Sequence, residues 1–126
     1  MGKIRLIFGT YNSLPIVIDE SLYEKTYQMA YKPFLKELNN FSGVAVTLYY
    51  SGFLLKWLAT KHPEFIMLLK DMQKRKQVDI IGGCYYEPFL PLIPHSDRLG
   101  QIEGLTTLMR ELFGKKPRGG WIPESL

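Results

Sequence analysis

Short apolar runs alternate with longer amphipathic segments along this chain. Four such runs lie at residues 3–8 (KIRLIF), 44–50 (VAVTLYY), 78–83 (VDIIGG) and 119–122 (GGWI). The first is closed by Gly9, and the second is rich in the β-branched and aromatic residues that favour strands. Apolar runs of this length are typical of strands in a buried parallel sheet. The pattern therefore predicts four strands.

Helical patterns fill the stretches between the apolar runs. The first begins at Ser21 and repeats apolar residues at helical spacing as far as Leu38, with a kink expected at Pro33. Residues 52–76 predict two helices in tandem, because Pro63 suits the first turn of a helix and disfavours helical geometry just before it.

A third helical region spans residues 97–113 and is closed by Gly114. The resulting alternation of strands and helices predicts parallel strands joined by right-handed crossovers. A chain of 126 residues has the length of one domain. We therefore expect a single α/β domain over residues 1–126, with four parallel strands and crossover helices.

Composition and charge narrow the possible functions. Hydrophobic residues make up 46% of the chain and charged residues 22%, as in ordinary globular proteins. The net charge is +4, and its main cluster at Lys70–Gln77 ends a helical pattern, where cations complement the helix dipole. No nucleic-acid motif accompanies it. Neither a signal peptide nor a membrane-spanning run is present, so no membrane association and a cytoplasmic location are expected.

Candidate chemistry gathers just after the predicted strands. Sites in parallel α/β folds form at the carboxyl ends of the strands, and here those positions are rich in aromatic residues and glutamates. Aromatic rings with carboxylates between them suit a sugar, whose ring faces stack and whose hydroxyls need acceptors. The candidates are Tyr11, Tyr86, Glu87, Trp121 and Glu124.

Other reactive side chains are scattered. Cys84 is the single cysteine, so it cannot form an intrachain disulfide, and neither His62 nor His95 is placed by sequence to activate it. Two scattered histidines do not make a metal site. We therefore expect no metal and no cofactor, and a structural role for Cys84.

Four stretches carry a family resemblance: FGTYNSLP, YSGFLLKWL, KQVDIIGGCYYEPFLPLIPHSDRLGQIE and GGWIPESL. Together they resemble the N-terminal half of the catalytic barrel of glycoside hydrolase family 57. That family contains 4-α-glucanotransferases, α-amylases, amylopullulanases and branching enzymes. The resemblance implies half of a (β/α)7-type, TIM-like barrel and a truncated catalytic-barrel segment.

The resemblance also implies roles for individual residues. It makes Glu124 the catalytic nucleophile position, Trp121 a sugar-contacting platform and Glu87 a substrate-binding residue. The first-strand motif of active members is His-Asn-His-Gln-Pro, whereas this chain has YNSLP, so Tyr11 and Ser13 replace both histidines.

Catalysis by the isolated chain is not expected. A retaining glycosidase needs two carboxyl groups about 5–5.5 Å apart, and the family's acid/base aspartate lies on a later strand. We expect a protein that is catalytically incomplete alone and binds an α-glucan or maltooligosaccharide weakly. The alternative is the N-terminal part of a retaining α-glucan hydrolase or transferase, completed by a partner chain or by downstream sequence. Glu87 as a substitute acid is a weaker hypothesis.

Half of a barrel also predicts self-association. Val44, Val46, Ile80 and Ile81 are expected to line an apolar inner face, and a half-barrel leaves two open sheet edges. Two-fold pairing is the commonest form of assembly, so we expect a homodimer formed through the open half-barrel.

Overall fold

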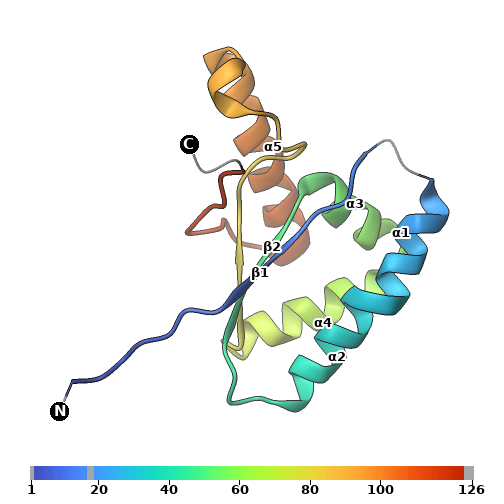
Figure 1. The fold of residues 1–126 in the computed structure, drawn as a ribbon, viewed down its shortest axis with the longest axis vertical. Coiled ribbons are helices and arrows are strands. Elements are labelled where there is room, and N and C mark those ends of the chain that lie inside the picture. The colour runs from blue at the N-terminus through green and yellow to red at the C-terminus, as the bar shows by residue number, and fades with distance from the viewer. Residues whose placement is uncertain (1, 17–18, 124–126) are drawn as a thin grey trace.

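The computed structural model describes residues 2–16 and 19–123, which fold around a three-stranded parallel sheet (Figure 1). Its strands are β1 (Gly9–Asn12), β2 (Val46–Tyr50) and β3 (Val78–Ile81), in the spatial order β1-β2-β3. Because all three run in the same direction, their carboxyl ends lie at one edge of the sheet. The α/β class and the parallel sheet are as predicted.

The first strand lies later in the chain than predicted. Residues 3–8 are extended but leave the sheet, and Leu6 and Ile7 are almost fully exposed (Figure 1). In the register of the sheet Gly9 is opposite Thr47, and β2 begins only at Val46. Only Phe8 of this run meets β2, where its carbonyl accepts from the Thr47 amide over 2.9 Å. The described structure places no strand beside residues 3–7, so the strand forms from the less apolar segment that follows.

The predicted fourth strand is reduced to an isolated parallel bridge between Gly82 and Gly120. The Gly82 amide donates to the Gly119 carbonyl over 2.8 Å, and the Trp121 amide donates to the Gly82 carbonyl over 2.9 Å. Glycines offer no side chains to pack, and Pro123 has no amide to continue the ladder. The prediction of four strands is therefore wrong for the described residues, which form three strands and this bridge.

The first helical region is continuous but irregular. It consists of α1 (Glu20–Thr26), a π-helical turn η1 (Tyr27–Tyr31) and α2 (Lys32–Asn40). The π turn ends just before Pro33, which cannot donate a backbone hydrogen bond and whose ring crowds the preceding turn. The irregularity expected at this proline therefore takes the form of a widened turn.

The remaining helices follow the predicted pattern. After β2 come α3 (Gly52–Lys61) and α4 (Pro63–Lys74), divided at Pro63 as expected. After β3 a short 3-10 helix, η2 (Leu90–Leu92), precedes α5 (His95–Phe113). No helix among the described residues is long and apolar enough to cross a membrane.

The core lies between one face of the sheet and the helices (Figure 1). Side chains at alternate strand positions are buried there, among them Val46, Leu48 and Ile80. They pack with helical residues such as Leu54, Leu69 and Leu105.

No helix of the described residues lies over the opposite face (Figure 1). This face carries Tyr11, Thr47, Asp79 and Ile81. This open face is the one that we predicted to be apolar and to carry Val46 and Ile80. That part of the prediction is wrong, because both residues belong to the core and the open face is mixed in polarity.

Candidate functional site

The carboxyl ends of the three strands bring Ser13, Tyr49 and Glu87 into contact. The Tyr49 hydroxyl donates to Oε1 of Glu87 over 3.0 Å, and the Ser13 hydroxyl donates to Oε2 of the same carboxylate. Ser13 follows β1, Tyr49 lies in β2, and Glu87 lies in the connection after β3. One carboxylate therefore links all three strand ends.

Tyr49 is a fixed donor in this cluster. Its ring is only 1% exposed, although it points to the open side of the sheet. Burial raises the pKa of Tyr49 well above its usual value, and the negative charge of Glu87 raises this pKa further. The hydroxyl therefore keeps its proton at neutral pH, and it also lies 3.3 Å from the carbonyl oxygen of Cys84.

Aromatic rings extend the cluster across the open face. Tyr11 stacks on Tyr49 with ring centroids 5.3 Å apart and an angle of 10° between the planes. Trp121 follows at 5.6 Å from Tyr11, tilted by 43°. Tyr11 is 48% exposed and Trp121 is 42% exposed. The outer part of this row is therefore accessible to a ligand, while Tyr49 supports it from beneath.

A hollow of about 360 Å³ opens beside the carboxylate. Tyr86 lines this hollow and is half-exposed. Its backbone amide donates to the Gln101 side chain over 2.8 Å. The lining of the hollow thus combines two aromatic rings and a carboxylate with apolar side chains. Its lining residues are Tyr11, Ser13, Leu14, Pro15, Ile16, Tyr86 and Glu87.

The structure thus brings four of the five candidate residues to the same end of the sheet. Tyr11, Tyr86 and Glu87 line one hollow, and Trp121 contacts Tyr11. Glu124 lies outside the described residues, so its predicted role stays a prediction.

Ser13 and Tyr49 were not predicted as site residues. Ser13 lies in the stretch FGTYNSLP and Tyr49 in the predicted strand at residues 44–50, but only the tertiary fold shows that their hydroxyls meet Glu87.

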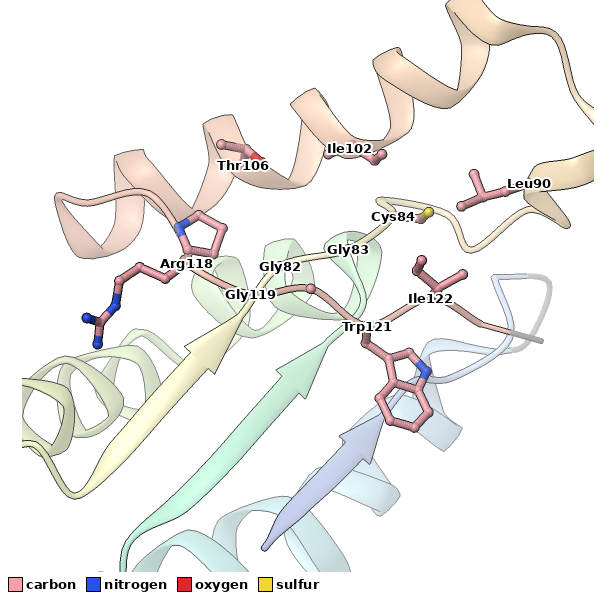
Figure 2. A pocket seen from close by; sticks show the side chains of 12 residues that line it. Gly82, Gly83, Cys84, Leu90, Ile102, Thr106, Arg118, Gly119, Trp121 and Ile122 are labelled. Atoms are coloured by element: carbon pink, nitrogen blue, oxygen red, sulfur yellow. The ribbon is translucent and has the colours of Figure 1, made fainter. Parts of the chain in front are cut away.

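A second hollow, of about 400 Å³, lies between α5 and the segment that carries the Gly120 bridge (Figure 2). Figure 2 shows Ile102 and Thr106 on α5 above the chain at Gly82 and Gly83, with the Trp121 ring turned toward the strands. Cys84 is buried beside this hollow, and burial raises the pKa of its thiol. A thiol held in its neutral form is a poor nucleophile, which agrees with a structural role.

The two histidines do not join either hollow. His62 lies on the helix side, with Nε2 2.7 Å from Glu24 and Nδ1 3.0 Å from Glu64, and its ring stacks on Tyr27. His95 is exposed at the start of α5. Among residues 2–16 and 19–123, no group of three or more His, Cys, Asp or Glu side chains could hold a metal ion.

The arrangement is that of a partial α/β barrel in which aromatic rings and a carboxylate gather at the carboxyl ends of the strands. The sequence matches glycosyl hydrolase family 57 over residues 3–126, and the chain belongs to this family. It is 36% identical over 122 residues to alpha-amylase 1 of Dictyoglomus thermophilum. It is 37% identical over 124 residues to the 4-alpha-glucanotransferase of Thermococcus kodakarensis.

Solved structures agree with this assignment. The 4-alpha-glucanotransferase of Thermococcus litoralis superposes with a TM-score of 0.91 at 37% identity, covering 97% of this chain and 19% of that chain. A branching enzyme from Pyrococcus horikoshii shares the fold, with a TM-score of 0.72 at 14% identity, over 94% of this chain and 33% of that chain. The present chain spans 18% of the Dictyoglomus relative and 19% of the Thermococcus kodakarensis relative.

Proposed function

We propose that this chain is an α-glucan-binding segment of a family 57 barrel that is catalytically incomplete on its own. The observation that carries the proposal is the cluster at the strand ends. There the Glu87 carboxylate, fixed by Ser13 and Tyr49, lies beside the exposed rings of Tyr11 and Trp121. The names of the family relatives, α-amylase and 4-α-glucanotransferase, support an α-glucan as the ligand.

The chemistry of the cluster suits a short glucan. The rings of Trp121 and Tyr11 offer faces and edges for the apolar faces of glucose units. The Glu87 carboxylate accepts hydrogen bonds and so suits sugar hydroxyls, which are donors. An open hollow of about 360 Å³ leaves most of a bound oligosaccharide in contact with solvent, which favours weak binding. A millimolar dissociation constant, on the order of −4 kcal/mol, is the expected affinity.

A linkage control tests the binding part of this proposal. In isothermal titration, maltohexaose should bind with a millimolar dissociation constant, whereas cellohexaose of the same length and different linkage should bind at least several-fold more weakly. Glu87→Gln preserves the shape of the side chain and removes its charge, so it should weaken binding. Equal affinity for both sugars, or none for maltohexaose, contradicts an α-glucan site.

Turnover by a retaining mechanism needs two catalytic carboxyl groups, a nucleophile and an acid/base. By the family resemblance Glu124 is the nucleophile position, and a retaining mechanism requires an acid/base at about 5–5.5 Å from it. Loss of a positioned general acid costs about 10²–10⁴-fold in rate. The purified chain should therefore show no measurable hydrolysis or transfer on starch or maltooligosaccharides. Turnover that Glu124→Gln abolishes would contradict this part of the proposal.

The second candidate function is the front part of a retaining α-glucan hydrolase or transferase that another polypeptide or further sequence completes. The observation that favours it is identity of 37% over 98% of this chain, within only 19% of the Thermococcus kodakarensis relative. The gene sequence beyond codon 126 tests whether the same polypeptide completes the barrel. Further barrel strands with an aspartate at the acid/base position support completion in the same polypeptide, and a stop codon excludes it.

We also propose that the chain pairs with a second copy through its open sheet. β1 is an edge strand, and the segment before it exposes Ile4, Leu6 and Ile7 almost completely. An unprotected edge next to apolar side chains favours pairing with another chain. Sedimentation at micromolar concentration should give twice the formula mass of 14.6 kDa. A well-folded monomer refutes the proposal.

A further inference from the structure

Glu87 is held from two sides before any ligand arrives. Its Oε2 accepts from the Ser13 hydroxyl after β1, and its Oε1 accepts from the Tyr49 hydroxyl in β2. These two donors belong to different strands, so the carboxylate can neither rotate nor swing without breaking a hydrogen bond. We call Ser13, Tyr49 and Glu87 the hydroxyl clamp.

Packing holds Tyr49, one of the two donors to Glu87. Tyr49 is 1% exposed, and its ring stacks against the Tyr11 ring with 10° between the planes. Glu87 has φ 58, in the left-handed region that a residue other than glycine rarely adopts. Residues in this region persist where surrounding contacts hold them, and they concentrate at ligand sites. The hydroxyl clamp supplies such contacts.

We propose that Ser13 and Tyr49 are positioning residues that make Glu87 a fixed acceptor for sugar hydroxyls. This inference rests on the proposed α-glucan site and deepens it. Each carboxylate oxygen has two acceptor positions, and the clamp uses one of them on each. The other two remain for a pair of neighbouring hydroxyls on a glucose unit in the adjoining hollow.

The test compares Ser13→Ala with Ser13→Thr, which keeps the hydroxyl, and uses Ser96→Ala at an exposed position of α5 as the matched control. The first measurement, without sugar, is the Glu87 side-chain carboxyl signal in a protein labelled with 13C at glutamate, assigned through Glu87→Gln. Ser13→Ala should shift this signal, while Ser13→Thr and Ser96→Ala should leave it near its original position. An unchanged signal in Ser13→Ala overturns the clamp.

The second measurement is a maltotriose titration of the same variants. Ser13→Ala should weaken binding about 5- to 10-fold, because a carboxylate held by Tyr49 alone is less well ordered and the ligand must order it further. Ser13→Thr should restore the affinity to within about twofold. A shifted carboxyl signal with unchanged affinity overturns the positioning role and leaves the proposed function standing.

A further result separates this inference from the function on which it rests. If the unaltered protein binds no maltotriose, the proposed function fails and the sugar-accepting role of Glu87 fails with it. A carboxyl signal that responds to Ser13→Ala in that protein still supports the clamp.

Discussion

The two faces of the sheet differ in what covers them and in the side chains they carry. On the helix-covered face Leu48 and Ile80 are at most 2% exposed and pack into one apolar core. On the open face, in the same strands, Thr47 and Ile81 are half-buried and Asp79 is exposed. Alternate residues of one strand thus differ in role: one set stabilises the fold, and the other, apart from the buried Tyr49, keeps part of its surface exposed.

Aromatic residues show the same division. On the helix side, Tyr27 and Trp57 pack against each other and against the ring of His62. At the open end, Tyr11 and Trp121 keep nearly half of their surface exposed. Two exposed rings in contact with each other offer an apolar surface at this end of the sheet, which supports the proposed ligand site there.

Neighbouring residues of β2 provide the sharpest test of the difference between the faces. Leu48→Ala should lower the free energy of unfolding by about 2–5 kcal/mol, because it leaves a cavity in a fully buried site. Thr47→Ala, one residue away on the open face, should cost less than about 1 kcal/mol. Urea unfolding measures both, and equal losses would show that the two faces do not differ in their contribution to stability.

The contact between the start of α3 and the connection after β3 should be the next most sensitive to substitution. A Cβ at Gly52, at the start of α3, would lie 2.3 Å from the Tyr85 ring, which belongs to the connection that carries Glu87. Gly52→Ala should therefore destabilise the fold by about 1–3 kcal/mol through overpacking. Gly100→Ala in α5 is the control, since a Cβ there meets nothing within 4 Å. A lower melting temperature for Gly100→Ala than for Gly52→Ala would contradict the close packing of Gly52 against Tyr85.

On the helix side, His62 joins α1 to the start of α4. Its ring lies 3.6 Å from the Tyr27 ring between centroids and contacts Glu24 and Glu64 through its two nitrogens. His62→Gln should lower the free energy of unfolding by about 1–2 kcal/mol, through lost stacking and hydrogen bonding. His95→Gln, at an exposed position, should change it little. Because His62 is remote from the strand ends, maltohexaose binding by folded His62→Gln protein should not change.

The smallest effect is a dependence of stability on acid pH. The pKa of Glu24 is lowered from 4.5 by hydrogen bonds from Gln28 and His62. The pKa of Glu64 is lowered from 4.5 by a backbone hydrogen bond, with a further contribution from His62. A carboxylate whose pKa is lower in the folded state adds stability above pH 4.5 and loses it as the pH falls through the folded value. Urea unfolding from pH 6 to pH 3 should show this loss, and His62→Gln should reduce it; equal slopes contradict the link.

The sequence predicted those elements whose pattern is local. The apolar run at residues 44–50 and the helix start at Pro63 are confirmed by β2 and α4, because each carries its own periodicity or cap. The run at residues 3–8 was misjudged, since apolar character alone does not tell which residues will find a partner strand. The fourth strand failed for a similar reason: Gly119 and Gly120 can form a bridge but give a ladder little to pack.

The site, like the fold, could be predicted from the sequence only in part. The position of Glu87 and Trp121 near strand ends followed from the order of elements, and the fold brings both to the open end of the sheet. The contacts of Glu87 with Ser13 and Tyr49 join residues 74 and 38 positions apart in the chain. Such contacts depend on strand order and register, which no local pattern encodes.

The most direct test of the account is an NMR titration of the two tryptophan indole signals with maltotriose. Trp121 lies at the open end of the sheet, whereas Trp57 lies on the helix side against Tyr23 and serves as the internal control. We predict that the Trp121 signal shifts with a millimolar midpoint, on the order of −4 kcal/mol, while the Trp57 signal stays in place. No shift of Trp121 at high sugar concentration, or equal shifts of both signals, would contradict an α-glucan site on the open face.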